Sequence, residues 1–246
     1  MARLLATILF LSHLSIVYGQ TASPSSGKPS FTEYIRRHLP VKRELDVFLN
    51  EMSWAKFDPE VGYVLGNFVP RDGVDESATI STSQPDGTRT SFAYCNQPCR
   101  INTYGNSFTL CHQVSDGETW QEYLAAHLGE PIRNYGMGGF GLYQSYRRML
   151  REEQTDNGAE YVMLYIWGDD HRRSLLRCRY LLIDAWNRKQ NSQEGIGRMF
   201  HGNFWSNIEM NLDTGKLEEH ENRLSTHTSL YKMLDGKQRE QALVQR

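Results

Sequence analysis

The chain is predicted to be an α/β protein in which helices cover a parallel β-sheet. From residue 100 onward, short strand-like runs alternate with segments of helical periodicity, which is the pattern that builds such a sheet. A composition of 39% hydrophobic residues, with 4 cysteines among 246 residues, is typical of an ordinary folded protein. The 27 Lys and Arg residues nearly balance the 29 Asp and Glu residues, so no basic stripe is available to bind a phosphate backbone. We therefore expect no nucleic-acid partner.

Residues 1–19 are predicted to be a secretory signal peptide. Arg3 precedes an apolar run over residues 4–11, and Val17 and Gly19 occupy the two positions at which a signal peptidase reads small side chains. The run is shorter than the roughly 20 apolar residues that a membrane-spanning helix needs. The sequence therefore predicts a secreted or periplasmic protein with no stable membrane span after signal cleavage.

Two segments lie between this signal and the predicted sheet. Residues 20–30 are small and polar and include prolines, which favours a flexible leader. The segment 31–99 is predicted to hold a helix followed by β-rich structure. Its first part, 31–52, has apolar residues at helical spacing. Further on, two alternating runs within 78–94 flank the turn Pro85–Gly87, which predicts a hairpin.

The predicted sheet domain spans residues 100–236. A capping box at Ser115–Glu118 precedes a helix that ends at Gly129, and the apolar run 161–167 is the clearest candidate for a buried strand. The apolar residues on one face of that helix are Trp120, Tyr123, Leu124 and Leu128. In chain order, the predicted elements are a strand over 100–104, the helix ending at Gly129, a strand over 132–135, a helix over 143–153, the strand 161–167, a helix over 172–189, a hairpin over 204–212 and 216–221, and a polar tail over 237–246.

Three loops that directly follow predicted strands carry glycine or polar residues. These loops are Gly105–Ser107, Gly138–Gly139 and Gly168–Asp170. In an open α/β sheet, ligands bind outside the carboxyl ends of the strands, so we expect the three loops to converge on one site. Ser107 would then stand at a tight turn, where main-chain N–H groups can face a developing oxyanion.

The same loops resemble the successive sequence blocks of the SGNH (GDSL-type) hydrolases. The likeness extends over residues 100–175, and its segments are Gly105–Thr109, Asp116–Leu124, Asn134–Gly141 and Trp167–Asp170. The resemblance implies a flavodoxin-like three-layer sandwich with a parallel sheet, preceded by the β-rich segment and carrying the hairpin as an insertion or appendage. It also implies a secreted esterase. Because exported members of this family often deacetylate polysaccharides, the expected substrate is a small ester or an acetylated carbohydrate.

The resemblance further implies roles for individual residues. Ser107 is the expected nucleophile, and its own N–H and that of Gly139 are the expected oxyanion donors. Asp169 occupies the position of the family's third donor, an asparagine. A carboxylate cannot donate a hydrogen bond unless it is protonated, so this donor is either missing or a neutral acid. Asn106 stands where the first block of the family has Asp.

The catalytic base departs further from the family pattern. The family carries an Asp-x-x-His near the C-terminus, in which the His deprotonates the serine. None of the 8 histidines of this chain follows an Asp or Glu by three residues. His227 lies far enough along the chain to be a substitute, and His171 lies beside the third block. Both are also compatible with a surface or structural role.

Two other interpretations stay open. In the first, the domain keeps the fold and its cleft but binds a glycan or a partner without turnover, because Asp169 replaces a donor and the Asp-x-x-His is absent. In the second, the chain is the product of a truncated gene whose catalytic histidine is missing. Neither a cofactor nor a metal is expected, since the cluster Asp169–His171 lacks partner ligands.

The disulfide pattern is not fixed by the sequence. Four cysteines in an exported chain, here Cys95, Cys99, Cys111 and Cys178, allow three connectivities. One local disulfide or buried thiols is the simplest expectation. A zinc site is less favoured, because the Cys95 and Cys99 spacing has no second close pair of Cys or His residues.

Overall fold

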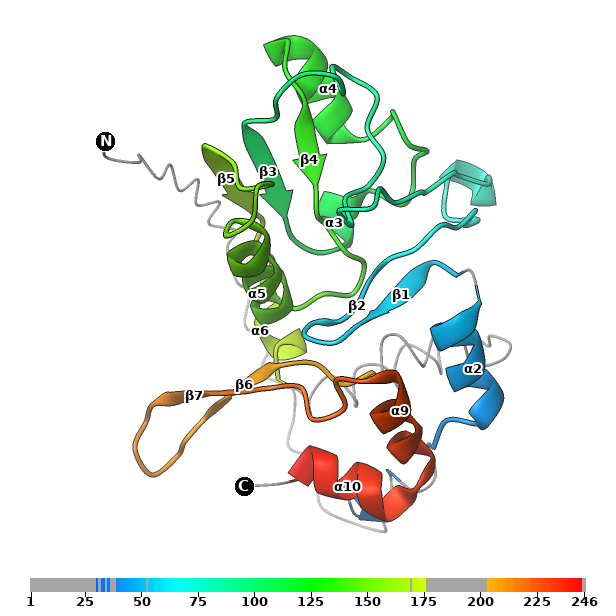
Figure 1. Cartoon of the computed structure of the whole chain (residues 1–246), viewed down its shortest axis with the longest axis vertical. Helices are drawn as coiled ribbons and strands as arrows, with labels where there is room; N and C mark the ends of the chain where they lie inside the picture. Colours follow the sequence, from blue (N-terminus) through cyan, green and yellow to red (C-terminus); the bar gives the residue numbers. More distant parts are fainter. Residues whose placement is uncertain are drawn as a thin grey trace, which may run out of the picture.

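The computed structural model describes residues 30, 32–33, 35, 39–51, 53–168, 170–175 and 203–244. The predicted signal peptide, nearly all of the predicted leader, and most of the predicted helix over 172–189 lie outside these residues. In chain order, the elements (Figure 1) are α2 (Lys42–Asn50), β1 (Ala55–Asp58), β2 (Gly62–Leu65), η1 (Val74–Glu76), β3 (Ile101–Tyr104), α3 (Ser107–Leu110), α4 (Trp120–Leu128), β4 (Ile132–Asn134), α5 (Leu142–Glu152), β5 (Tyr161–Leu164), α6 (Asp170–Arg173), β6 (Asn207–Met210), β7 (Leu217–His220), α9 (His227–Leu230), η2 (Tyr231–Leu234) and α10 (Gly236–Val244).

The described part of the chain contains a three-stranded parallel sheet of order β4-β3-β5. Ile101 on the central strand pairs with Ile132 on one side and with Tyr161 on the other. Helices α4 and α5 connect these strands, as parallel pairing requires. The predicted α/β class is therefore confirmed as a mixed α/β fold with a parallel sheet.

Strand β5 differs from its prediction as the clearest buried strand. It pairs with a neighbour on one side only and forms an edge of the described sheet. Tyr161 and Met163 are 44% and 40% exposed, while Val162 and Leu164 are half-buried. The prediction of a buried strand was wrong, because a continuous apolar run does not show whether a strand lies in the centre or at the edge of a sheet.

Helix α4 ends at Gly129, as predicted, but buries a different face from the apolar one. Trp120, Tyr123 and Leu128 are exposed, whereas Gln121, Glu122 and Ala125 are buried. The reason is that the interior offers polar partners to this helix. Gln121 donates to the Thr109 carbonyl, and the Glu122 carboxylate accepts the backbone N–H groups of Phe92 and Ala93. Ser115 and Glu118 form a turn before the helix, with the Ser115 N–H donating to the Glu118 carboxylate.

The N-terminal segment is less regular than predicted. Within the predicted helix over 31–52, the described residues 32, 33 and 35 are helical and α2 covers 42–50; the antiparallel hairpin β1–β2 follows. Across the turn Pro85–Gly87, the two arms pair antiparallel at one bridge between Ser83 and Arg89, with backbone hydrogen bonds from Gln84 to Thr88 and from Thr90 to Thr82. Continuous strands do not form there, because the same stretch also bridges outward, from Ser81 to Phe68 and from Arg89 to Asn134.

The C-terminal part confirms the second predicted hairpin. Strands β6 and β7 pair antiparallel from Asn207 with His220 to Met210 with Leu217. The polar tail contains part of α10, which begins at Gly236. No helix in the described ranges is long and apolar enough to cross a membrane.

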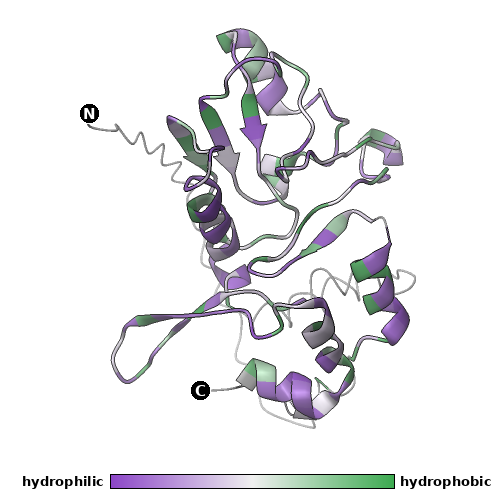
Figure 2. Cartoon of the chain, viewed as in Figure 1, coloured by the Kyte–Doolittle hydropathy of each residue, from purple (hydrophilic) through white to green (hydrophobic). Residues whose placement is uncertain are grey.

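The largest apolar core lies away from the parallel sheet. It joins α2, the β1–β2 hairpin and the C-terminal helices, which occupy the middle and lower parts of Figure 1. Its buried members include Leu45, Phe48, Ala55, Tyr63, Leu65, Met137, Phe140, Phe204, Trp205, Leu230, Met233 and Leu243. The sheet contributes only a small cluster of Ile101, Ala125 and Ile132. Helix α5, beside the sheet, is coloured mainly hydrophilic in Figure 2, although several of its side chains are buried.

The three described cysteines are free thiols. Cys95 and Cys99 are not bonded to each other, so the structure does not contain the local disulfide, which is one of the two simple expectations from the sequence. The Cys99 thiol donates to the carbonyls of Ile101 and Pro131, and the Cys111 thiol donates to the Phe108 carbonyl. Cys178 lies outside the described residues.

Candidate active site

Ser107 is the first residue of α3 and stands where β3 ends. The residues of 101–106 are buried, as are Thr109 and Leu110, but Ser107 is half-buried and Phe108 is 58% exposed. Among the described residues, none forms a hydrogen bond with Ser107 Oγ or with the Ser107 N–H. The turn therefore brings one serine from the interior to the protein surface with its hydroxyl and its amide uncommitted.

Asn106 fixes this turn through both ends of its side chain. Its Oδ1 accepts the Phe108 N–H at 2.9 Å, which caps the start of α3. Its Nδ2 donates to both carboxylate oxygens of Asp170, at 2.9 and 3.0 Å, and both residues are 1% exposed. An aspartate in place of Asn106 would set two carboxylates against each other without water. The structure thus gives a physical reason for Asn where the resembled family has Asp.

Asp170 ties a second loop to the serine turn. Besides its contacts with Asn106, its Oδ2 accepts the Trp167 N–H at 2.8 Å, and its Oδ1 lies 3.6 Å from an Arg173 nitrogen. These contacts hold the segment after β5 against the first residues of α3. His171 directly follows Asp170 in α6, and its side chain is exposed. Asp169, which the family resemblance predicts to stand at the third oxyanion-donor position, lies outside the described residues.

The glycine-rich loop after β4 completes the site. The Met137 N–H donates to the Gly105 carbonyl at 3.0 Å, and a Cβ added to Gly136 would lie 2.3 Å from the Leu110 nitrogen. Only glycine allows the loop to approach α3 this closely. Gly139 has a φ of +73°. It is half-buried, whereas the residues on both sides of it in the loop are buried. Its N–H makes no hydrogen bond to a described residue. The three loops of the sequence prediction therefore meet at the start of α3, through the contacts of Gly105 with Met137 and of Asn106 with Asp170.

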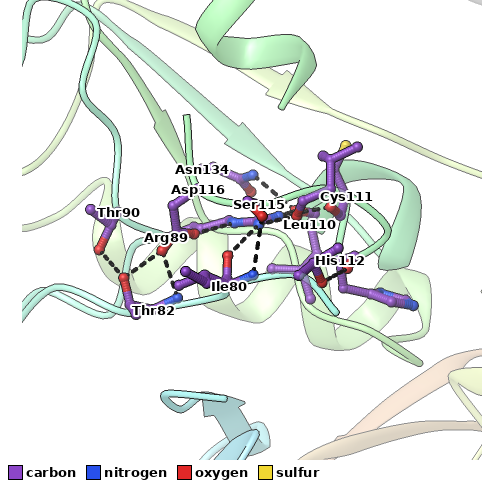
Figure 3. A network of polar contacts seen from close by, with 12 residues as sticks. Ile80, Thr82, Arg89, Thr90, Leu110, Cys111, His112, Ser115, Asp116 and Asn134 are labelled. Carbon is purple, nitrogen blue, oxygen red and sulfur yellow. Dashed lines mark hydrogen bonds and ion pairs between the residues drawn. The ribbon is translucent and has the colours of Figure 1, made fainter. Parts of the chain in front are cut away.

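A buried ion pair supports the far end of α3 (Figure 3). Arg89 Nε donates to Asp116 Oδ1 at 2.7 Å, and the two side chains are 1% and 5% exposed. The same guanidinium donates to the carbonyls of Leu110 and Cys111, at 2.6 and 2.8 Å, where α3 ends. Its remaining nitrogen donates to the Val114 carbonyl at 2.6 Å. Arg89 thus occupies the carbonyl end of the short helix whose other end carries Ser107.

Arg89 and its hydrogen bonds to Asp116 and to the carbonyl end of α3 are here called the polar clamp. Asp116 also links this polar clamp to the turn-rich N-terminal segment. Its Oδ2 accepts the Thr82 N–H at 2.9 Å and the Thr82 hydroxyl at 2.5 Å (Figure 3). Asp116 falls in a block of the family resemblance, but Arg89 did not stand out in the sequence. A single arginine within an alternating run carries no signal that distinguishes a buried guanidinium from a solvated one.

Exposed aromatic rings lie beside Ser107. The ring of Phe108 lies 5.9 Å from that of Tyr165 and 5.6 Å from that of Trp167, centroid to centroid. Trp167 is 46% exposed, and the Trp120 indole N–H donates to the Phe108 carbonyl. Aromatic side chains that contact each other and stay exposed at a site are suited to bind the apolar face of a ligand.

The described histidines differ in their surroundings. His227 begins α9, where its ring packs edge-on against Phe57 of β1 at 5.1 Å. In Figure 1, α9 and α3 lie on opposite sides of the β1–β2 hairpin, so the fold does not bring His227 to Ser107. His112 follows α3 with its Nε2 3.7 Å from Asp72, and burial lowers the pKa of its imidazole. His112 Nδ1 is buried without a hydrogen-bond partner.

No family model matches the chain, and neither a curated protein nor a solved structure is significantly similar to it. Within the described ranges, no three His, Cys, Asp or Glu side chains gather in a way that could hold a metal ion.

Proposed function

We propose that the protein is a secreted serine esterase of SGNH type, with a flavodoxin-like fold around its parallel sheet. The observation that supports this most is the convergence of three loops on Ser107, which stands at the carboxyl end of the central strand β3. The proposed substrate is a small ester or an O-acetyl group on carbohydrate. The exposed rings of Phe108 and Trp167 support a ring-shaped alcohol component.

In the proposed mechanism, Ser107 Oγ attacks the carbonyl carbon of the ester. The negative charge that develops on the carbonyl oxygen is bound by the N–H groups of Ser107 and Gly139, neither of which is engaged with a described residue. Collapse of the tetrahedral intermediate releases the alcohol and leaves an acyl group on the serine. Water then hydrolyses this acyl-enzyme and restores the free hydroxyl.

Asp169 is expected to limit the rate of this reaction. An ionised carboxylate at the third donor position cannot donate to the oxyanion and would repel it. Loss of one such donor typically lowers kcat by about a hundredfold to a thousandfold. The proposed enzyme is therefore expected to be slower than an SGNH hydrolase that has all three donors.

The test is hydrolysis of p-nitrophenyl acetate by the purified protein and by Ser107→Ala. We expect Ser107→Ala to lose the activity, because Ser107 is half-buried and can reach a substrate, whereas the nearby hydroxyl residues Thr109 and Tyr63 are buried. The matched control is Ser225→Ala, which removes the hydroxyl of an exposed serine near α9 and should leave the rate unchanged. Equal rates for Ser107→Ala and the unmodified protein would refute the nucleophile.

A second candidate function is glycan or partner binding without turnover. It is favoured by the acidic residue Asp169 and by the absence of an Asp-x-x-His from the sequence. Tryptophan fluorescence would detect binding at Trp167 when an acetylated oligosaccharide is added. Binding together with no hydrolysis of the same oligosaccharide would favour this second function over the esterase.

A further inference from the structure

We propose that His171, and not His227, is the general base for Ser107, and that the contact between Asn106 and Asp170 is what positions it. This inference rests on the proposed esterase function. It assigns the proton acceptor that the sequence does not supply in the family's usual place.

The loop after β5 and the Ser107 turn are directly connected. Asn106 and Asp170 are the immediate chain neighbours of Ser107 and His171, and their side chains bond to each other through two contacts of 2.9 and 3.0 Å. Both side chains are almost fully buried, so this amide–carboxylate contact is shielded from water and held in one geometry. His171, the proposed base, and Ser107, the proposed nucleophile, each directly follow in the chain one of the two residues that form this contact.

Helix α6 directs Asp170 and His171 to different sides. Successive residues of a helix point about 100° apart around its axis, so Asp170 and His171 cannot face the same way. Asp170 points into the interior and is 1% exposed, which leaves His171 on the outer side of the same loop. Ser107 is half-buried, and it is the chain neighbour of Asn106, which bonds to Asp170; the proposed arrangement lets one substrate contact both Ser107 and His171.

The His171 imidazole is not engaged by another described residue. Within the described ranges, its ring forms no hydrogen bond, ion pair or ring contact, and only its backbone carbonyl is engaged, by the Ser174 N–H. His227, by contrast, packs its ring against Phe57, which in turn packs against Phe48 of α2. That environment belongs to the apolar core on the other side of the β1–β2 hairpin.

The proposed proton transfers balance over the full cycle. A nitrogen of the His171 imidazole takes the Ser107 hydroxyl proton as the bond from Oγ to the carbonyl carbon forms. The imidazolium then gives that proton to the oxygen of the leaving alcohol as the ester bond breaks. In the second half, the same nitrogen takes a proton from the attacking water and returns it to Ser107 Oγ as the acyl bond breaks.

The first experiment compares His171→Ala and His227→Ala in hydrolysis of p-nitrophenyl acetate. A general base typically contributes about a hundredfold to ten-thousandfold, so we expect a loss of this size in kcat for His171→Ala and less than a twofold change for His227→Ala. Added imidazole should restore part of the activity of His171→Ala, which a merely structural histidine would not show. The exposed His127, replaced by Ala, is the matched control.

The second experiment tests the positioning contact by exchanging its partners. Asn106→Asp sets two carboxylates against each other, and Asp170→Asn replaces one of the two acceptor oxygens of Asp170 with an NH2 group that faces the Asn106 amide. We expect each to lower kcat at least tenfold. The double variant rebuilds the pair in reverse, because the introduced carboxylate could still accept the Phe108 N–H and the introduced amide oxygen the Trp167 N–H. It should recover most of the lost kcat.

The outcomes separate this inference from the proposed function. If Ser107→Ala is as active as the unmodified protein, the esterase itself is wrong. If Ser107→Ala is inactive but His171→Ala keeps its full kcat, the esterase stands and the assignment of the base is overturned. A double variant as slow as the single ones, with an unchanged circular dichroism spectrum, would overturn the role of the Asn106 and Asp170 contact.

Discussion

Two regions of the molecule, here called the apolar half and the polar half, are each stabilised by a different kind of interaction. The region built from α2, the β1–β2 hairpin and the C-terminal helices packs apolar side chains such as Leu45 and Leu230, both 0% exposed. Around the parallel sheet, the buried side chains are largely polar and are joined by hydrogen bonds. The apolar half supplies bulk stability and also packs Met137 and Phe140 of the glycine-rich loop, while polar contacts fix the Ser107 turn and the loop after β5 in one geometry.

The polar half extends behind the site as well. Asn102, fully buried on the central strand, donates to the Glu153 carboxylate and to the Asn157 carbonyl at 2.7 and 2.8 Å. The Tyr104 hydroxyl donates to the same carboxylate, and burial together with this contact raises the pKa of that phenol. Arg148 is buried and donates to the carbonyls of Tyr135 and Gly87. A residue lost from such a network leaves its partners unsatisfied.

The largest expected effect comes from Arg89→Met. Removing one partner of a buried ion pair leaves the Asp116 carboxylate uncompensated, and such changes typically cost about 3–5 kcal/mol of unfolding free energy. Because Arg89 also holds the carbonyl end of α3, the folded fraction of the variant should have a lower kcat. Urea unfolding and the kinetics of p-nitrophenyl acetate hydrolysis measure the two effects.

The matched control for Arg89 is Arg100→Met, since Arg100 pairs with Glu160 on the surface, where both side chains are about half exposed. We expect little change in stability and none in kcat. If Arg89→Met were as harmless as this control, the polar clamp would not hold the site.

Leu45→Ala probes the apolar half. Truncation of a fully buried leucine leaves a cavity and typically costs about 2–5 kcal/mol. Unlike Arg89→Met, it should leave kcat of the folded protein unchanged, because Leu45 belongs to the apolar core and not to a loop of the candidate site. Leu212→Ala, at an 89% exposed position, is the control. A loss of kcat in Leu45→Ala would contradict the division of roles between the two halves.

A smaller effect is expected from the pH dependence of His112. Burial lowers its pKa below the ordinary 6.5, so the unfolded chain binds this proton more readily than the folded protein does. The stability that depends on neutral His112 is complete above about pH 6.5 and falls as the pH drops below it. Urea unfolding of His112→Gln between about pH 5 and 7 should show a shallower decline than the unmodified protein.

The smallest effect is expected from Tyr123→Ser on α4. Because Tyr123 is 72% exposed, we expect a change in stability within about 0.5 kcal/mol, as for most surface substitutions. Ala125→Asp on the buried face of the same helix is the contrast and should destabilise strongly. If the order of the two effects were reversed, α4 would bury the apolar face after all.

The sequence predicted well those features that depend on local chain chemistry. The three strands of the sheet, the helix end at Gly129 and the β6–β7 hairpin follow from apolar runs, a glycine and turn residues. The convergence of the three loops follows from strand order alone. Polar partners within the interior were not predictable, because the partners of Gln121 and Arg89 lie 9 or more residues away along the chain.

The same limit applied to the candidate site. Ser107 and the glycine loop could be found from their spacing, but the contact between Asn106 and Asp170 joins residues 64 positions apart. This contact forms only because β5 pairs with β3, which brings the loop after β5 to α3. The choice between the histidines likewise depends on which side of the β1–β2 hairpin each one lies.

The most direct test of the central claim is the mass of the protein after reaction with a fluorophosphonate probe. A serine activated as a nucleophile forms a stable adduct with such a probe, so we predict one adduct per chain, and peptide mapping should place it on Ser107. Ser107→Ala should gain no mass under the same conditions. An unlabelled protein, or equal labelling of Ser107→Ala at another residue, would contradict the assignment of Ser107 as the nucleophile.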